Sequence, residues 1–206
     1  MNIICNNCGG ADIYNFKRME FSNPFIWSLL FPDDMIKLIN DYDKLNFENY
    51  EPILLDEKYS VVNNYDRFNP TISGILIDKT AKVYYTHYLY GTQNIPTTIG
   101  PDVFYNKNVE YMYSKFETRL NRMINLNEKP SFLVICYKRH GWTMEKIEKL
   151  LNTDFKYKTV VITKEKIEKN KNNLTLIHNE KLESIYKLPI QAIRLNQSEI
   201  FNGLGI

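Results

Sequence analysis

The order of apolar and polar positions along the chain predicts strands that alternate with helices. Residues 132–136 are apolar at every position, which is typical of a strand buried on both faces of a parallel sheet, and we expect this strand to span Ser131–Tyr137. Val103–Asn125 repeats apolar residues at helical spacing and predicts the longest helix. The other expected elements are a helix that opens at Phe31-Pro32-Asp33-Asp34, a helix capped by Thr143 that runs to Leu151, and strands at Pro52–Leu55, Ile72–Ile77, Val83–Leu89, Thr159–Thr163, Leu174–His178 and Ala192–Leu195.

This succession of elements predicts a three-layer α/β/α sandwich. The sheet is expected to be mostly parallel but mixed, because the strands at 72–77 and 83–89 read as a hairpin with a four-residue connection. Gly91–Pro101 then forms a loop long enough to be a lid. We see no internal repeat and no domain boundary, so a single α/β domain over residues 1–206 is expected.

The first strand is expected to end in a bend that forms a ligand site. Its apolar run stops at Cys5, and Asn6-Asn7-Cys8-Gly9-Gly10 follows before a helix that begins near Ala11. Open α/β sheets bind ligands at the carboxyl ends of their strands, and two glycines allow a close backbone approach there. This bend is therefore the candidate functional site.

Composition and charge narrow the classes of function. Hydrophobic residues make up 44% of the chain, as in an ordinary globular protein, and a net charge of +2 gives no reason to expect nucleic-acid binding. No apolar run approaches the roughly 20 residues of a membrane span. The start of the chain lacks the pattern of a secretion signal, and three cysteines make no disulfide framework, so a cytoplasmic protein with reduced thiols is expected. No phosphate-binding or dinucleotide-binding glycine motif is present, and no cofactor is expected.

Cys8, at the bend, is the candidate nucleophile. A helix N-terminus and a nearby imidazole can lower a thiol pKa from its ordinary value of about 8.5. We expect His87, at the end of a predicted strand, to be the base, with His140 as second choice and the N–H groups of Gly9 and Gly10 as oxyanion donors. The alternative is that Cys8 is a small half-buried hydrophobe and His87 a hydrogen-bonded core histidine.

Cys5 and Cys8 also have the C-x-x-C spacing of a zinc knuckle or a redox dithiol. Zinc needs four ligands, and the chain has no second such pair and no closely spaced pair of histidines. Cys136 and His87 could complete a ligand set only if the tertiary structure brought them there. No metal site is therefore expected.

Several other side chains are candidates for binding a ligand. Arg119 and Arg122 lie three residues apart on the longest predicted helix and could clamp an anion, although a solvated helix face is the ordinary role of such a pair. Lys138-Arg139-His140 has the same two interpretations. Trp27 could floor a pocket or anchor a core. The predicted ligand-binding set is Asn6, Asn7, Gly9, Gly10, Trp27, Arg119, Arg122 and His140.

The same segments resemble a known family in order and spacing over most of the chain. Asn6-Asn7-Cys8-Gly9-Gly10, Ser22-Asn23-Pro24-Phe25-Ile26-Trp27 and Met35-Ile36-Lys37-Leu38-Ile39 look like the opening of the bacterial domain-of-unknown-function family nineteen-nineteen. Tyr85-Thr86-His87-Tyr88 resembles its histidine-tyrosine strand end, and Lys115–Asn125 its arginine-bearing helix. The resemblance implies a three-layer α/β domain encoded with genes of capsule or exopolysaccharide biosynthesis, in a family for which no reaction is established.

A looser similarity is to bacterial proteins proposed to be papain-like cysteine peptidases, which also have an early cysteine, a proline-phenylalanine-aspartate-tryptophan motif and a later histidine. Ile26 stands where that motif has aspartate, and Arg139-His140-Gly141-Trp142-Thr143 departs from the aspartate-bearing form of the first family. The resemblance thus carries over Cys8 and His87 as candidate chemistry, and Arg119 and Arg122 as candidate anion binders.

The sequence therefore predicts a protein of capsule or exopolysaccharide biosynthesis that acts as a Cys–His transferase or hydrolase on a glycan-related substrate. Two alternatives stay open. The first is a non-catalytic protein that binds a sugar nucleotide or a phosphorylated sugar. The second is an assembly partner within a biosynthetic complex.

Overall fold

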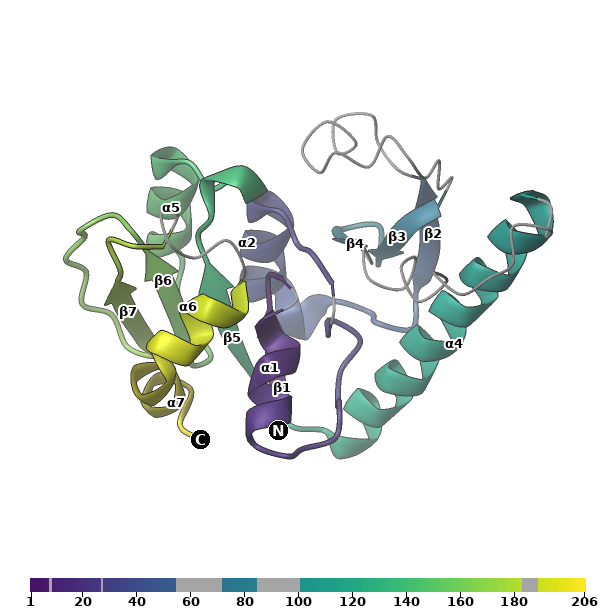
Figure 1. The fold of residues 1–206 in the computed structure, drawn as a ribbon, viewed down its shortest axis with the longest axis horizontal. Helices are drawn as coiled ribbons and strands as arrows, with labels where there is room; N and C mark the ends of the chain where they lie inside the picture. The colour runs from purple at the N-terminus through teal and green to yellow at the C-terminus, as the bar shows by residue number, and fades with distance from the viewer. Residues whose placement is uncertain (8, 27, 55–71, 85–100, 183–188) are drawn as a thin grey trace.

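A parallel four-stranded sheet, sheet A, forms the centre of the protein (Figure 1). The computed structural model describes residues 1–206 except 8, 27, 55–71, 85–100 and 183–188. The strand order is β1-β5-β6-β7, and each pair of neighbours is parallel. The strands of sheet A are β1 (Asn2–Cys5), β5 (Pro130–Ile135), β6 (Thr159–Thr163) and β7 (Leu174–His178).

The hairpin belongs to a separate antiparallel sheet, sheet B, and not to one mixed sheet as expected. Its strands, in spatial order, are β2 (Tyr50–Leu54), β3 (Ile72–Ile77) and β4 (Ala81–Tyr84). The connection between β3 and β4 is one residue shorter than predicted and includes Asp78 and Lys79, which have φ of 48° and 54°. Residues 85–89 of the predicted strand and 91–100 of the predicted lid lie outside the described residues.

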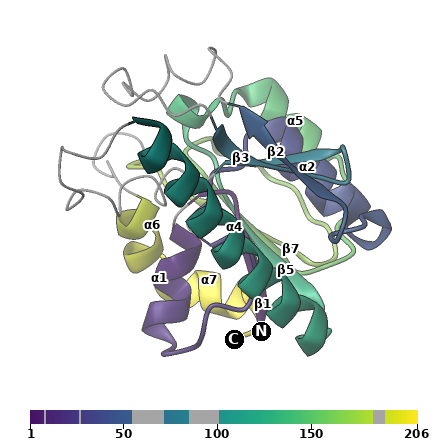
Figure 2. The same cartoon turned by 90° about the vertical axis from the view of Figure 1, so that its right-hand side faces the viewer.

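Helices cover both faces of sheet A, which confirms the predicted α/β sandwich (Figures 1 and 2). One face packs against α1, α6 and α7, and the other against α2, α5 and sheet B. Sheet B lies between α2 and the long helix α4 (Figure 1). The helices are α1 (Gly9–Phe16), α2 (Pro32–Asp41), α4 (Pro101–Leu126), α5 (Met144–Leu151), α6 (Pro189–Leu195), α7 (Gln197–Leu204) and the short 3₁₀ helices η1 (Tyr42–Lys44) and η2 (Lys138–His140). Among the described helices, none has both the length and the apolar character needed to cross a membrane.

The central strand β5 shows why its sequence is apolar throughout. Phe132 and Val134 pack into the core shared with α2 and α5, whereas Leu133 and Ile135 pack into the core shared with α1, α6 and α7. All four side chains are completely buried. Because both faces of the strand are covered, no polar position alternates with the apolar ones.

Local signals place two of the helices as predicted. Pro32 opens α2, and carboxylates occupy its first turn. Thr143 caps α5, because its hydroxyl oxygen accepts a hydrogen bond of 3.3 Å from the N–H of Lys146.

The predicted strand Ala192–Leu195 is wrong, because these residues belong to α6. Ala192 and Ile193 are buried while Arg194 and Leu195 are exposed, and so short an apolar run does not distinguish a strand from a helix. The helix α7, which follows at once, was not expected. It packs so closely on sheet A that a Cβ on Gly203 would lie 2.7 Å from Cγ2 of Val160.

Asp34 joins α2 to sheet B. Its Oδ1 accepts a hydrogen bond of 3.1 Å from the N–H of Lys82 in β4, and its side chain is buried. Burial raises the pKa of Asp34 above its ordinary value, although the bond from Lys82 opposes this. Its neighbour Asp33 is exposed and pairs with Lys146 and Lys149, and the hydrogen bond from Lys146 is the main reason that its pKa is lowered.

We expect Asp34→Asn to raise the free energy of unfolding at neutral pH. A raised folded-state pKa means that ionised Asp34 opposes folding, and this cost is absent at acid pH and appears as the pH rises through that pKa. An asparagine oxygen still accepts the bond from Lys82. Asp33→Asn should do the opposite, because its ion pairs stabilise the protein above the unfolded pKa and are lost in acid. Denaturant unfolding from pH 3 to 7 measures both, and parallel profiles for the two variants would contradict this assignment.

Candidate functional site

The bend after β1 is built by Asn6, whose side chain extends the sheet. The Asn6 Nδ2 donates to the carbonyl of Ile135 at 3.1 Å, and its Oδ1 accepts from the N–H of Ile135 at 2.9 Å. The backbone N–H of Asn6 donates to Leu133 in the same strand. A carboxamide offers one donor side and one acceptor side, as a peptide group does. Asn6 therefore adds a side-chain rung to the β1–β5 ladder, and it is completely buried.

Asn7 turns the chain from β1 into α1. Its Oδ1 accepts from the N–H of Gly9 at 3.0 Å and from the thiol of Cys5 at 3.5 Å, and its carbonyl accepts from the N–H of Gly10 at 3.4 Å. Its Nδ2 donates to Asn6 at 3.2 Å. The N–H groups of Gly9 and Gly10 are thus bonded within the turn, which differs from the expectation that they face a substrate as oxyanion donors.

Gly10 lets α1 approach the strand that it follows. A Cβ at this position would lie 2.8 Å from the Cβ of Cys5, closer than real Cβ contacts. Glycine is needed here for space, and the close contact fixes the first turn of α1 on the end of β1.

The two predicted catalytic residues, Cys8 and His87, lie outside the described residues, as does Trp27. The residues that flank Cys8 are described: Asn7 ends the bend and Gly9 begins α1. The other two thiols are buried, Cys5 with 1% and Cys136 with 3% of its surface exposed, and burial raises the pKa of Cys136. Within the described part of the chain, no three acidic, histidine or cysteine side chains gather where they could hold a metal ion.

Arg119 and Arg122 hold the segment Phe21–Ile26 against α4. Nη1 of Arg119 donates to the carbonyl of Ile26 at 3.1 Å, and its guanidinium lies over the ring of Phe21 at 5.2 Å. Nη1 of Arg122 donates to the carbonyl of Phe21 at 2.6 Å and lies 3.4 Å from the carboxylate of Glu20. Both guanidinium groups therefore fasten the 21–26 segment to α4. The anion-binding role of this pair stays a prediction from the sequence.

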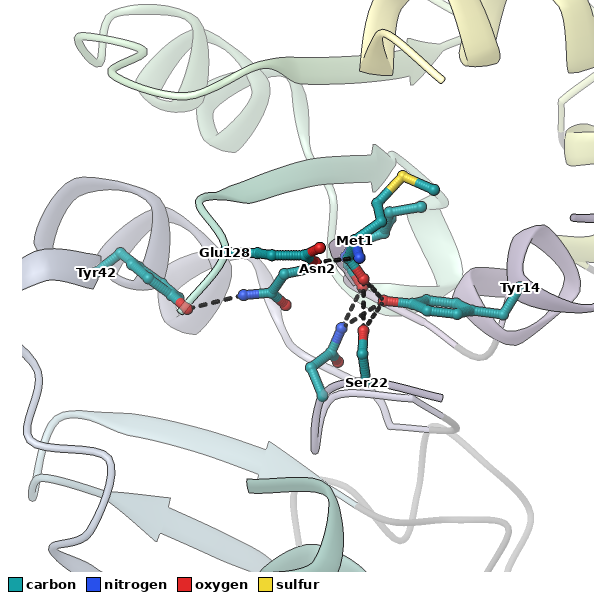
Figure 3. Close-up of polar contacts among 8 residues, drawn as sticks. Met1, Asn2, Tyr14, Ser22, Tyr42 and Glu128 are labelled. Carbon is teal, nitrogen blue, oxygen red and sulfur yellow. Dashed lines mark hydrogen bonds and ion pairs between the residues drawn. The ribbon is translucent and has the colours of Figure 1, made fainter. Parts of the chain in front are cut away.

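The other side of this segment is held by Tyr14, which pattern analysis did not single out (Figure 3). The phenol oxygen lies 2.9 Å from both the N–H of Ile3 and the carbonyl of Met1, 2.8 Å from the Ser22 hydroxyl, and 3.0 Å from Nδ2 of Asn23. Tyr14 is completely buried. Asn23 also donates to the carbonyl of Ile3 at 2.8 Å, so the outer edge of β1 is closed by side chains.

This polar cluster continues to η1 through Asn2. The Asn2 Nδ2 donates to the hydroxyl of Tyr42 at 3.0 Å (Figure 3), and burial raises the pKa of Tyr42 to about 12. Tyr42 thus keeps its proton at neutral pH. The N-terminal amine of Met1 pairs with Glu128, which lies two positions before β5.

His140 lies in η2, in the turn that follows β5, and its ring meets the ring of Tyr137 edge-on at 5.4 Å. Burial, with a smaller contribution from Arg139, lowers the pKa of His140 to about 4. The imidazole is therefore neutral at neutral pH and cannot supply a positive charge to a nearby thiol. Its Nδ1 is buried without a hydrogen-bond partner, and so is Nε1 of Trp142 two residues later.

The structure thus brings Asn6, Asn7, Gly9 and Gly10 together with the turn of His140, at the carboxyl ends of the neighbouring strands β1 and β5. Arg119 and Arg122 lie instead on α4, against the 21–26 segment. No protein-family model matches the chain, and no curated protein shows significant similarity to it. The family resemblance and the chemistry therefore remain proposals.

We expect Tyr14→Phe to lower the free energy of unfolding by about 2–4 kcal/mol, because a buried N–H and a buried amide lose their acceptor. Tyr50→Phe is the matched control: its hydroxyl bonds to Glu117 in an exposed contact, so we expect a loss of about 0.5 kcal/mol or less. Urea denaturation measures both. Equal losses would show that the Tyr14 hydroxyl is not a structural centre.

Gly10→Ala should destabilise the protein by about 1–3 kcal/mol through overpacking against Cys5. The clash involves the Cβ of Cys5, so a double-mutant cycle with Cys5→Gly should recover part of this loss. A cycle with Cys5→Ser, which keeps the Cβ, should recover none. Purely additive effects in the Cys5→Gly cycle would contradict the assigned contact.

Proposed function

We propose that the protein is a cysteine-dependent transferase or hydrolase that acts on a glycan-related substrate in capsule or exopolysaccharide biosynthesis. Cys8 is the nucleophile and His87 its base. The reaction class is acyl transfer, transfer of a glycosyl-linked group, or hydrolysis. The pathway rests on the resemblance to the bacterial domain-of-unknown-function family nineteen-nineteen.

The observation that supports this proposal most directly is the construction of the bend around position 8. Asn6 is held to β5 by three hydrogen bonds, and Asn7 and Gly10 hold the first turn of α1 against β1. In the sequence, position 8 falls between Asn7 of this bend and Gly9, the first residue of α1. Such a position, at the carboxyl end of a strand and before a helix N-terminus, favours a lowered thiol pKa and is where open α/β sheets carry their chemistry.

The rival proposal of a purely binding protein is less well supported by the same contacts. It relied on Asn6, Asn7, Arg119 and Arg122 to hold a sugar nucleotide or a phosphorylated sugar. Both asparagines are buried and satisfied within the bend, and both arginines donate to backbone carbonyls of the 21–26 segment. These interactions favour a structural role for all four residues.

Thiol alkylation across pH tests the proposal, because the buried Cys5 and Cys136 should not react in the folded protein. We expect one thiol to react with iodoacetamide, with a pKa clearly below the ordinary value of about 8.5. Peptide mapping should assign it to Cys8, and Cys8→Ser should abolish the reaction. His87→Ala should return the pKa toward its ordinary value. A Cys8 that titrates near 8.5 and ignores the loss of His87 would contradict the catalytic role.

A further inference from the structure

The turns at the carboxyl ends of β5 and β6 carry exposed basic side chains. Lys138 and Arg139 follow β5, and Lys164 directly follows β6, with Glu165 as the acidic neighbour. The strand order is β1-β5-β6, and neighbouring strands are about 4.8 Å apart. Cys5 pairs with Leu133, and Leu133 pairs with Val160, so β5 and β6 extend two and three residues past the end of β1. The strand spacing and the rise per residue then put the ends of β5 and β6 about 8 and 14 Å from the end of β1.

A second feature of the same turn is the unpaired Nδ1 of His140. Buried polar atoms are nearly always hydrogen-bonded, and leaving one unpaired costs about 1–3 kcal/mol. Among the described residues only three buried side-chain nitrogen or oxygen atoms lack a partner, and this one lies beside the basic pair Lys138 and Arg139. Because Nδ1 has almost no solvent-accessible surface, the missing partner must be a group that the turn encloses, such as a bound ion. The unpaired Nε1 of Trp142 has a different setting, because this side chain belongs to the core between sheet A and the helices α2 and α5.

We infer that the turn Tyr137–Gly141, together with Lys164, binds an anionic oxygen group of the substrate, such as a phosphate, with His140 hydrogen-bonding to it through Nδ1. The identity of the substrate rests on the proposed function, whereas the existence of the subsite does not. This subsite moves anion binding from Arg119 and Arg122 on α4 to the strand next to β1. There the anion would lie beside the bend where the reaction is proposed.

The subsite makes a thermodynamic prediction about His140. An anion next to the imidazole favours its protonated form, so binding must raise the pKa of His140 from about 4. A rise of one unit corresponds to tenfold tighter binding of the anion to the protonated protein. Among the described residues, Arg139 is the charged group that acts on the imidazole, and it lowers the pKa of His140.

Proton NMR titration with inorganic pyrophosphate, at ionic strength matched with sodium chloride, tests this prediction. The chain has three histidines, and His140→Gln assigns the signal. We expect a saturable rise of at least one unit in the pKa of His140. His178, beside Glu180 at the end of β7, serves as the internal control and should not change. Malonate in place of pyrophosphate distinguishes a carboxylate from a phosphate, and either one, if saturable, supports the subsite.

The strands provide matched charge-reversal controls. Lys138→Glu/Lys164→Glu changes the carboxyl ends of β5 and β6. Lys129→Glu/Lys158→Glu makes the same change directly before these strands, about 20 Å or more away. The first pair should abolish the pyrophosphate effect and the second should leave it intact. No saturable change, or an equal effect in both double variants (an adventitious ion only), would overturn the inference.

Cys8 offers a separate readout that keeps the two proposals distinguishable. If the thiol is reactive, the ratio of its alkylation rate with anionic iodoacetate to that with neutral iodoacetamide should exceed the ratio for free cysteine. This ratio should fall in Lys138→Glu/Lys164→Glu and stay unchanged in Lys129→Glu/Lys158→Glu. A reactive Cys8 without this preference and without a shift of His140 overturns the subsite alone. An unreactive Cys8 with a shifted His140 overturns the proposed catalysis and leaves the subsite.

Discussion

The arrangement around the site depends on one constraint: the backbone groups on the outer edge of β1 need hydrogen-bond partners. This strand lies at one end of sheet A and pairs only with β5 in the described sheet, so its other edge has backbone groups that need partners. Tyr14 accepts from the N–H of Ile3, Asn23 donates to its carbonyl, and the N–H of Leu30 donates to Asn6 at 3.0 Å. Side chains and a loop therefore take the place of a neighbouring strand, and they fix α1 and residues 21–26 and 28–30 along β1.

The same constraint accounts for the attachment of α4. The 21–26 segment lies between β1 and α4, and its carbonyls receive Arg119 and Arg122 on the side away from the sheet. Arg119 and Arg122, which the sequence offers as anion binders, thus donate to backbone carbonyls. A guanidinium has several donors and holds an irregular segment well. The consequence is that the asparagines of the bend and the two arginines serve the structure. In our proposal, recognition of a substrate is therefore assigned to groups on the neighbouring strands.

The bend after β1 and the turn after β5 differ in their charge and in how their polar groups are hydrogen-bonded. The bend after β1 has its asparagine side chains satisfied internally and carries no charged residue from Asn6 to Gly10 apart from the thiol at position 8 when ionised. The turn after β5 has two basic residues and an imidazole nitrogen without a partner. The parallel pairing of β1 with β5 sets the uncharged bend beside the basic turn. This arrangement fits the nucleophile and the anionic substrate group that we propose.

The sequence alone determined the elements whose signals are local. The apolar run of β5, the strand β6, the proline start of α2 and the Thr143 cap of α5 depend on residues within a few positions of one another, and they form as predicted. The position of the bend between β1 and α1 was also predictable, because its turn residues are contiguous. Tertiary structure alone decided the rest: α6 in place of a strand, the separation of sheet B, the bonds of Asn6 to a residue 129 positions away, and the burial that keeps His140 neutral. Each of these depends on a partner that is distant in the chain, and no local pattern of apolar and polar residues specifies which partner that is.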